Sequence, residues 1–421
     1  MNNVHTLILN HAGMGIGGIE VTFAKLMRYC LEQGYRVIWI TNRSCYETAS
    51  FRDVVDDSRV EKIFLSTGKK LLGGVGNLDI PFNTNENVTM ISCDVLNFAD
   101  ADGLRKKAKV QSFYHFMLLP HYTGSAYYPE RLFKKKGIRA LCYKEFKSIA
   151  NRLEQQNCVR AFSEIQLTAY EDNYKIKIDE KDNKTLKAIS SSPVLDTGRL
   201  EKRASERKSK IVITTCARFD FPHKAYLLGL IDAFKVLAAE YDSLYLVIVG
   251  YGLGQDIINK KISELPPKIA DRIKLAGKKS PDELIEIFNK STINVGLAGA
   301  LLDGAGCGLP SLVVQHYSYE CGCFGFLEDV KTDIAEGQGK PIIPYLKEII
   351  QCSNEEYVNH GEKAYEVQEQ LRESQPEYIF EQKNSSSQRC LSQRQRLFCK
   401  FIHCIATVKY RIFKESGFSE D

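Results

Sequence analysis

The segment NVGLAGALLDGAGCGLPSLVV, from Asn294 to Val314, decides the fold. It predicts a short buried strand, a glycine-rich turn, a helix start carrying Asp303, and a second strand opened by Gly308-Leu309-Pro310. Small residues at a helix start let a ligand reach backbone N–H groups, and the helix dipole favours a phosphate there. One carboxylate among these small residues suits the hydroxyl pair of a ribose. The segment therefore predicts a nucleotide site.

Around this segment, the second half of the chain alternates apolar strands with helical patterns. Strands are expected at Lys210–Cys216, Leu244–Gly250 and Arg272–Gly277. A helix is expected at His223–Ala239, and another begins at Ser280, whose spacing to Glu283 is that of a capping box. This alternation predicts a doubly wound parallel sheet.

The first half of the chain shows the same alternation, with a helix expected from Gly18 to Gln33. The expected strands are Val4–Asn10, Arg36–Thr41, Val60–Leu65, Asn87–Ser92, Val110–His115 and Val159–Ser163. A polar linker at Ser190–Lys210 separates the halves. We therefore expect an α/β protein with one Rossmann-like domain over residues 1–198, a second over 199–375, and a tail over 376–421. Ligands of such pairs usually bind in the cleft between the domains.

Composition indicates a globular protein without a membrane span. The 421 residues are 44% hydrophobic and 26% charged, with a net charge of +5 that is too small to predict nucleic-acid binding. The 13 cysteines form no repeated Cys-x-x-Cys pair, and Cys321 and Cys323 have no partners at zinc spacing. With no signal-peptide pattern visible, we expect free thiols and a cytoplasmic location.

The glycine-rich loop His11–Glu20 follows the first strand and permits three interpretations. Gly13, Gly15 and Gly18 match the spacing of a dinucleotide fingerprint, but no carboxylate ends the second strand, where only Arg43 could serve an NADP phosphate. The loop could also be a tight turn that needs glycine for steric reasons. In the third interpretation, Gly17 and Gly18 approach a phosphate held by the opposite domain.

Cations for such a phosphate follow the strand Lys210–Cys216. Arg218 and Lys224 lie six residues apart in the sequence RFDFPHK. A guanidinium fork and an ammonium group at this distance can hold one diphosphate. The alternative is a solvated loop with two ordinary surface cations. The position at the carboxyl end of a strand, in the same domain as Asp303, favours the diphosphate site.

Taken in order, these motifs resemble the retaining GT-B glycosyltransferases of the family 4 type. The resemblance runs from about Val4 to about Glu373, covering both domains. The segments that carry it are Gly17–Glu20, Ala161–Glu164, Ala217–Phe234, Tyr245–Gly254 and Asn294–Val314. It implies two Rossmann-like domains that face each other across a cleft, and a nucleotide-sugar donor.

The resemblance also implies roles for individual residues. Arg218 and Lys224 would hold the donor diphosphate, and Gly17 and Gly18 would face it across the cleft. Asp303 stands where the family has the glutamate that binds the nucleotide ribose. Val295 stands where the family has a glutamate that contacts the sugar, and valine cannot make that contact.

A histidine close to the transferring sugar is a further implication of the resemblance. His115 is expected at the end of its strand, facing the cleft. The alternatives are a histidine satisfied by neighbouring backbone, and His121 as the residue that serves instead. In such a transfer, the leaving diphosphate oxygen takes the acceptor proton, so the protein supplies positioning and charge stabilisation. Arg218, Lys224 and loop amides suffice for this, so no cofactor and no divalent metal are expected, and no Asp-x-Asp pair ends a strand.

The tail has no acidic residue between Asn384 and Lys414, whereas seven basic residues alternate with apolar ones at helical spacing. Such a helix could lie on an anionic membrane surface, or pack back on the N-terminal domain with its basic face in solvent. A second basic cluster contains Arg131, Lys134, Lys135 and Lys136. Neither cluster carries a nucleic-acid-reading motif.

We therefore expect a cytoplasmic glycosyltransferase, peripheral on the membrane, that extends a glycan or lipid-linked glycan in surface-polysaccharide synthesis such as capsule or lipopolysaccharide. A nucleotide-sugar epimerase on the same fold would need more acid–base side chains than His115 and Glu164. A scaffold that binds a nucleotide without turnover is supported by Val295. An NADP oxidoreductase is the least favoured, because no catalytic Tyr/Lys or His constellation is found.

Overall fold

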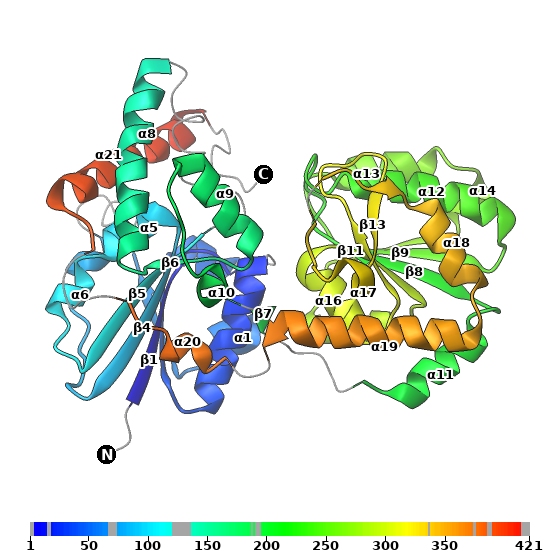
Figure 1. Cartoon of the computed structure of the whole chain (residues 1–421), viewed down its shortest axis with the longest axis horizontal. Helices are drawn as coiled ribbons and strands as arrows, with labels where there is room; N and C mark the ends of the chain where they lie inside the picture. Colours follow the sequence, from blue (N-terminus) through cyan, green and yellow to red (C-terminus); the bar gives the residue numbers. More distant parts are fainter. Residues whose placement is uncertain are drawn as a thin grey trace. The chain divides into compact units, whose positions relative to one another are not determined.

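The structure, a computed structural model, describes residues 4–14, 18–65, 74–119, 136–186, 188–189, 195–335, 337–373, 376–384 and 390–413. The chain forms two compact units (Figure 1). The first contains residues 1–189 together with 375–420, and the second contains residues 190–374. The division therefore falls after Ile189, whereas the sequence placed it after Gly198, and the C-terminal segment belongs to the first unit.

The first unit is built on a six-stranded parallel sheet with the order β3-β2-β1-β4-β5-β6. Its strands are β1 (Val4–Asn10), β2 (Arg36–Thr41), β3 (Val60–Phe64), β4 (Glu86–Cys93), β5 (Ser112–Leu118) and β6 (Val159–Arg160). In β1, Leu7 and Leu9 join one hydrophobic cluster and Ile8 another, so both faces of the sheet are covered. Burial on both faces explains why the strand reads as a continuous apolar run.

Helices and short elements of the first unit complete these layers. They are α1 (Gly18–Glu32), α2 (Arg43–Glu47), α3 (Arg52–Val55), η1 (Val75–Asn77), α5 (Asp94–Ala101), α6 (Leu104–Lys107), α8 (Lys136–Gln155), α9 (Glu164–Tyr174), α10 (Lys181–Lys184), β7 (Ala188–Ile189), α20 (Tyr378–Glu381) and α21 (Gln393–Phe413). The C-terminal helix α21 packs against α5 and α8, as Figure 1 shows. Its Phe398 ring meets Phe146 of α8 edge to face, at 5.2 Å between centroids.

The second unit is built on a seven-stranded sheet with the order β10-β9-β8-β11-β12-β13-β14. Its strands are β8 (Ile211–Cys216), β9 (Leu244–Val249), β10 (Ile273–Gly277), β11 (Ile293–Gly296), β12 (Ser311–Val314), β13 (Gly322–Phe326) and β14 (Lys340–Pro341). Strands β8 to β12 are parallel, whereas β13 and β14 add an antiparallel edge that the sequence did not predict.

Helices of the second unit surround its sheet. They are α11 (Thr197–Glu206), α12 (Tyr226–Glu240), α13 (Gln255–Ser263), α14 (Pro267–Ala270), α15 (Pro281–Asn289), α16 (Ala298–Gly306), α17 (Leu327–Val330), α18 (Ile343–Gln351) and α19 (Asn354–Leu371), followed by β15 (Arg372–Glu373). The predicted capping box is present, since Ser280 accepts from the Glu283 N–H and Glu283 accepts from the Ser280 N–H. The segment Asn294–Val314 forms most of β11, all of α16 and β12, as predicted.

The order of strands reverses once in each parallel sheet. In the first unit β1 lies between β2 and β4, and in the second unit β8 lies between β9 and β11. Open α/β sheets bind ligands beyond the carboxyl ends of the strands at such a reversal. In the second unit, the predicted diphosphate loop follows β8, and the glycine-rich turn follows β11.

Candidate functional site

The loop after β8 holds Arg218 and Lys224 on either side of Asp220. The Arg218 Nε lies 3.1 Å from Asp220 Oδ2, and the Lys224 N–H donates to the Asp220 carbonyl at 2.7 Å. These contacts curl the loop so that both cationic side chains belong to one turn. Both residues are partly buried, and the Arg218 side chain is 34% exposed.

The Lys224 ammonium group is poorly solvated and lies near the Arg218 guanidinium. Burial and, after it, the neighbouring Arg218 charge lower the pKa of its ammonium group to about 8, against the opposing effects of Asp220 and Cys216. Two cations that repel each other at a partly dry position are stabilised when an anion binds between them. The electrostatics of this loop therefore suit a diphosphate.

The start of α16 lies beside the end of β11 at the same reversal of strand order. Leu297 precedes the helix and offers no side-chain cap, and Ala298 takes a positive φ of 57°. A Cβ placed on Gly299 would meet no atom within 4 Å. The first turn of α16 thus has open space beside its backbone, as anion binding at a helix start requires.

Asp303 lies on α16 of the second unit. Its carboxylate is 21% exposed, and its Oδ1 accepts from Arg372 Nη2 at 2.5 Å. Burial raises the pKa of the Cys216 thiol to about 12, Asp303 raises it too, and Lys224 opposes this. The Asp303 and Lys224 charges both act on the pKa of Cys216, so both side chains lie near Cys216 at the end of β8. The structure thus brings together Arg218, Lys224 and Asp303.

Val295 is a core residue. It lies inside β11 with no exposed surface and packs in the main hydrophobic cluster of the second unit. The position that carries a sugar-binding glutamate in the resembled family therefore serves packing in this chain.

In the first unit, Gly18 begins α1 and is exposed, with no atom within 4 Å of a Cβ placed on it. Gly17 lies outside the described residues. Near Gly18, His11 Nε2 lies 3.0 Å from Glu20 Oε1, and Glu20 is buried. Burial lowers the pKa of His11, but Cys93 and Glu20 outweigh it and raise that pKa well above its usual value. Sequence analysis did not single out this ion pair.

His115 occupies a different place from the one expected. The strand β5 runs from Ser112 to Leu118, so His115 lies in its interior and not at its end. The ring has no exposed surface, stacks on Phe98 at 4.0 Å between centroids, and lies with Nε2 2.8 Å from Ser92 Oγ. Burial lowers the pKa of His115 to about 3, with Arg105 adding to the effect. The ring is therefore neutral and enclosed, and His121 lies outside the described residues.

Ser163 and Glu164, which the resemblance also included, lie at the start of a helix. They begin α9, where the Ser163 hydroxyl accepts from the Gln166 N–H, so their position is explained by helix capping. Arg372 is the site residue that sequence reasoning missed. It follows α19, 69 residues from Asp303, and no motif around it marks a role.

Comparison with solved structures shows which fold this is. The N-terminal domain of Candida albicans trehalose-6-phosphate phosphatase is 10% identical, with a TM-score of 0.52 over 97% of this chain and 97% of that chain. Sucrose-phosphate synthase from Thermosynechococcus elongatus is 13% identical, with a TM-score of 0.55 over 87% and 94%. A variant of S. aureus TarM, in complex with fondaparinux, α-GlcNAc-glycerol and UDP, is 10% identical, with a TM-score of 0.53 over 90% and 98%.

These similarities extend over both units, and at such identities they show the fold alone. The chain therefore has the GT-B fold of two Rossmann-like domains, as the sequence predicted. No model of a known protein family matches the sequence, and no curated protein matches it.

Proposed function

We propose that the protein is a glycosyltransferase that uses a nucleotide-sugar donor. The observation that carries this proposal is the grouping of Arg218, Lys224 and Asp303 at the reversal of strand order in the second unit. Two cations suit a diphosphate, and a partly exposed carboxylate on the adjacent helix suits the ribose hydroxyls. Structures with this fold include one bound to UDP-2-fluoro glucose and one bound to UDP.

The chemistry we propose is transfer with retention, in which the leaving diphosphate takes the acceptor proton. Arg218 and Lys224 stabilise the negative charge that develops on the leaving group. The Ala298 N–H of α16 already donates to the Asp333 carbonyl, so the amides that add to this effect are those of Gly299 and Ala300. These groups supply the charge stabilisation, so we expect transfer without a divalent metal. In the part of the chain that the structure describes, no group of three or more His, Cys, Asp or Glu side chains could hold a metal ion.

The acceptor we propose is a glycan or lipid-linked glycan of a surface polysaccharide, reached from the cytoplasmic face of a membrane. No helix among the described residues could span a bilayer. Two helices of the first unit instead carry exposed apolar side chains beside basic ones. Those on α8 are Ile138 and Leu141, and those on α21 are Leu397 and Phe401, each between 43% and 65% exposed.

Basic side chains accompany these apolar ones. Lys144, Lys147 and Arg152 of α8 line an open hollow of ≈ 450 Å³ together with Gln395 of α21. Cations beside exposed apolar groups suit the headgroups and acyl boundary of an anionic bilayer. We call the exposed apolar and basic side chains of these two helices the α8–α21 surface.

A nucleotide-binding protein without turnover is the second candidate, because Val295 is buried where a sugar contact would be needed. Incubation of the protein with a panel of nucleotide sugars in excess EDTA, followed by mass spectrometry, separates the two. Slow release of a nucleoside diphosphate and free sugar from one donor supports the transferase. Binding of nucleotide sugars with none consumed, even after manganese or magnesium is added, supports the second candidate. Consumption only after the metal is added contradicts the metal-free mechanism.

A further inference from the structure

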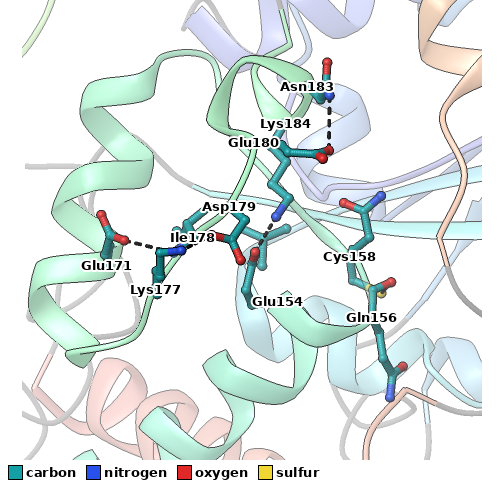
Figure 2. A network of polar contacts seen from close by, with 12 residues as sticks. Glu154, Gln156, Cys158, Glu171, Lys177, Ile178, Asp179, Glu180, Asn183 and Lys184 are labelled. Carbon is teal, nitrogen blue, oxygen red and sulfur yellow. Dashed lines mark hydrogen bonds and ion pairs between the residues drawn. The ribbon is translucent and has the colours of Figure 1, made fainter.

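Two buried cysteine side chains lie sulfur to sulfur inside the first unit. Cys158, just before β6, and Cys390, just before α21, are separated by 232 residues, and their Sγ atoms are 3.5 Å apart. Neither residue has exposed surface. Figure 2 shows Cys158 beside Gln156 and near the buried ion pair of Glu154 and Lys184. The thiols are therefore held together by the fold and not by neighbouring positions in the sequence.

The backbone at Cys390 is fixed from two sides. Asp102 accepts from the N–H of Cys390 at 2.7 Å and from that of Leu391 at 2.9 Å. On the other side, Arg152 and Gln156 donate to the Cys390 carbonyl. This arrangement fixes the Cys390 backbone beside Cys158, and burial of the Cys390 side chain confines its sulfur there.

Polar donors surround both sulfur atoms. Arg105 Nη1 donates to Cys390 Sγ at 3.4 Å, and Asn384 Nδ2 donates to Cys158 Sγ at 3.5 Å. Either thiol could be the donor in the contact between the two sulfur atoms. This contact lowers the Cys390 pKa, and the Arg105 charge acts in the same direction, whereas burial and the Asp102 charge oppose them. A thiol with stabilised anionic form is the better nucleophile, and a second thiol in contact with it can resolve the product.

We propose that Cys158 and Cys390 are a redox-active pair that closes into a disulfide when the protein meets a small peroxide. The Cys390 thiolate attacks one peroxide oxygen and becomes a sulfenic acid, while the O–O bond breaks and the other oxygen leaves as water after protonation. The Cys158 sulfur then attacks Cys390, the S–O bond breaks, and a second water leaves. Overall, two thiols are oxidised to one disulfide and one hydrogen peroxide is reduced to two waters. A small oxidant is required because both sulfur atoms are buried.

The bond would join Cys158, the residue that precedes β6, to Cys390, three residues before α21. Its formation needs the sulfur atoms to approach from 3.5 Å to about 2.05 Å. It would constrain a loop of more than 200 residues in the unfolded chain, which raises the unfolding temperature of the oxidised protein. Because α21 carries half of the α8–α21 surface, oxidation would fix that surface to the body of the unit.

The test treats the intact, folded protein with hydrogen peroxide, blocks remaining thiols under denaturing conditions, and digests the protein with trypsin. The two cysteines can be followed separately, because residues 153–160 (LEQQNCVR) and 390–394 (CLSQR) form separate tryptic peptides with one cysteine each. We expect a peptide pair joined through Cys158 and Cys390, with loss of both alkylated peptides. Reduction should restore them, and the oxidised protein should unfold at a higher temperature than the reduced one.

Controls separate a specific pair from general oxidation. Cys30 is as buried as the pair and lies alone in the tryptic peptide 29–36 (YCLEQGYR), so it should remain alkylated. Cys158→Ser and Cys390→Ser should each abolish the joined peptide and the rise in unfolding temperature. The proposal is overturned if both peptides of the wild-type protein stay alkylated, or if their cysteines reach sulfonic acid without joining. The proposal is also overturned if Cys158 and Cys390 form their disulfide no faster than Cys30 is oxidised.

Discussion

The carboxylate of Asp303 and the guanidinium of Arg372 form an ion pair of 2.5 Å between α16 and the residue that follows α19. The same Arg372 Nη2 donates to the Gly299 carbonyl at 2.9 Å, and the Arg372 side chain is only 2% exposed. One buried cation therefore ties the carboxylate to the first turn of its own helix. This pairing fixes the direction of Asp303 before a nucleotide binds, which reduces the ordering that binding requires.

The first prediction separates the ribose contact from the diphosphate contact. Asp303→Asn should weaken UDP binding by roughly 1–3 kcal/mol, because a charged hydrogen-bond acceptor for the ribose hydroxyls is lost. It should leave the affinity for inorganic pyrophosphate within about twofold, since pyrophosphate has no ribose. Calorimetric titration with both ligands measures this. An equal loss for both would place Asp303 elsewhere than at the ribose.

The second prediction concerns pH. In the free protein the Lys224 pKa is lowered to about 8, and a bound diphosphate should raise it again. The complex then holds a proton that the free protein loses above pH 8, so diphosphate affinity should fall as pH rises, by about tenfold between pH 7 and pH 9. Lys224→Arg keeps its charge across this range and should show no such fall. A parallel fall in both proteins would contradict the role of Lys224.

The third prediction follows from the enclosed ring of His115. Its pKa is about 3 in the folded protein, and the ordinary value is 6.5. Below pH 6.5 the histidine binds a proton in the unfolded chain but stays neutral in the folded protein. The free energy of unfolding therefore decreases as pH falls from 6.5 toward 3. Between pH 7 and pH 5 the wild-type protein should lose about 2 kcal/mol more of its unfolding free energy than His115→Gln does.

Urea unfolding at the two pH values measures this difference, and the other histidines serve as an internal control because both proteins share them. If both proteins lose the same free energy, His115 is not buried and neutral as described.

The role of His115 as a residue close to the transferring sugar remains a prediction. The described geometry supports the alternative of a histidine satisfied by its own surroundings.

The sequence could predict most of the fold because the chain signals it locally. Buried parallel strands such as Leu7–Leu9 are apolar on both faces, and the capping box at Ser280 marks a helix start wherever it occurs. Arg218, Lys224 and Asp303 could be proposed as site residues because each lies at the end of a predicted strand or within a predicted helix.

Other features depend on contacts that local patterns do not contain. The end of β5 is set by its pairing with β6, where Met117 faces Val159, so a strand ending at His115 was the natural but wrong prediction. The partner of Asp303 could not be predicted, because 69 residues separate it from Arg372. The contact between Cys158 and Cys390 could not be predicted either, because 232 residues separate them.

The fourth prediction tests the α8–α21 surface. Arg394 pairs with Glu145 and Arg396 lies 3.6 Å from the buried Asp102, so reversing their charges would disturb the packing of α21. Lys144, Lys147 and Lys400 are the better choice. Their joint replacement by glutamate should weaken binding to anionic liposomes at least about a hundredfold at low salt, since each basic residue near the surface contributes about 1 kcal/mol.

A matched variant of the second unit, with the exposed Lys235, Lys260 and Lys268 replaced by glutamate, changes the net charge equally. It should co-sediment with liposomes like the wild-type protein. If both variants lose binding together, attraction depends on net charge and not on this surface. If neither variant loses binding, the membrane interpretation fails.

The central claim is that the loop after β8 holds the diphosphate of a nucleotide sugar. Calorimetric titration of Arg218→Ala and Lys224→Ala with UDP and with GDP tests it most directly. The control is Lys261→Ala, which removes a half-buried lysine of the same unit that pairs with Asp232. Each of the first two variants should lose roughly 1.5–3 kcal/mol of binding free energy for the nucleotide that the wild-type protein prefers, while Lys261→Ala binds normally and all three proteins remain folded. Unchanged affinity in both loop variants, or no affinity of the wild-type protein for either nucleotide, would contradict the account.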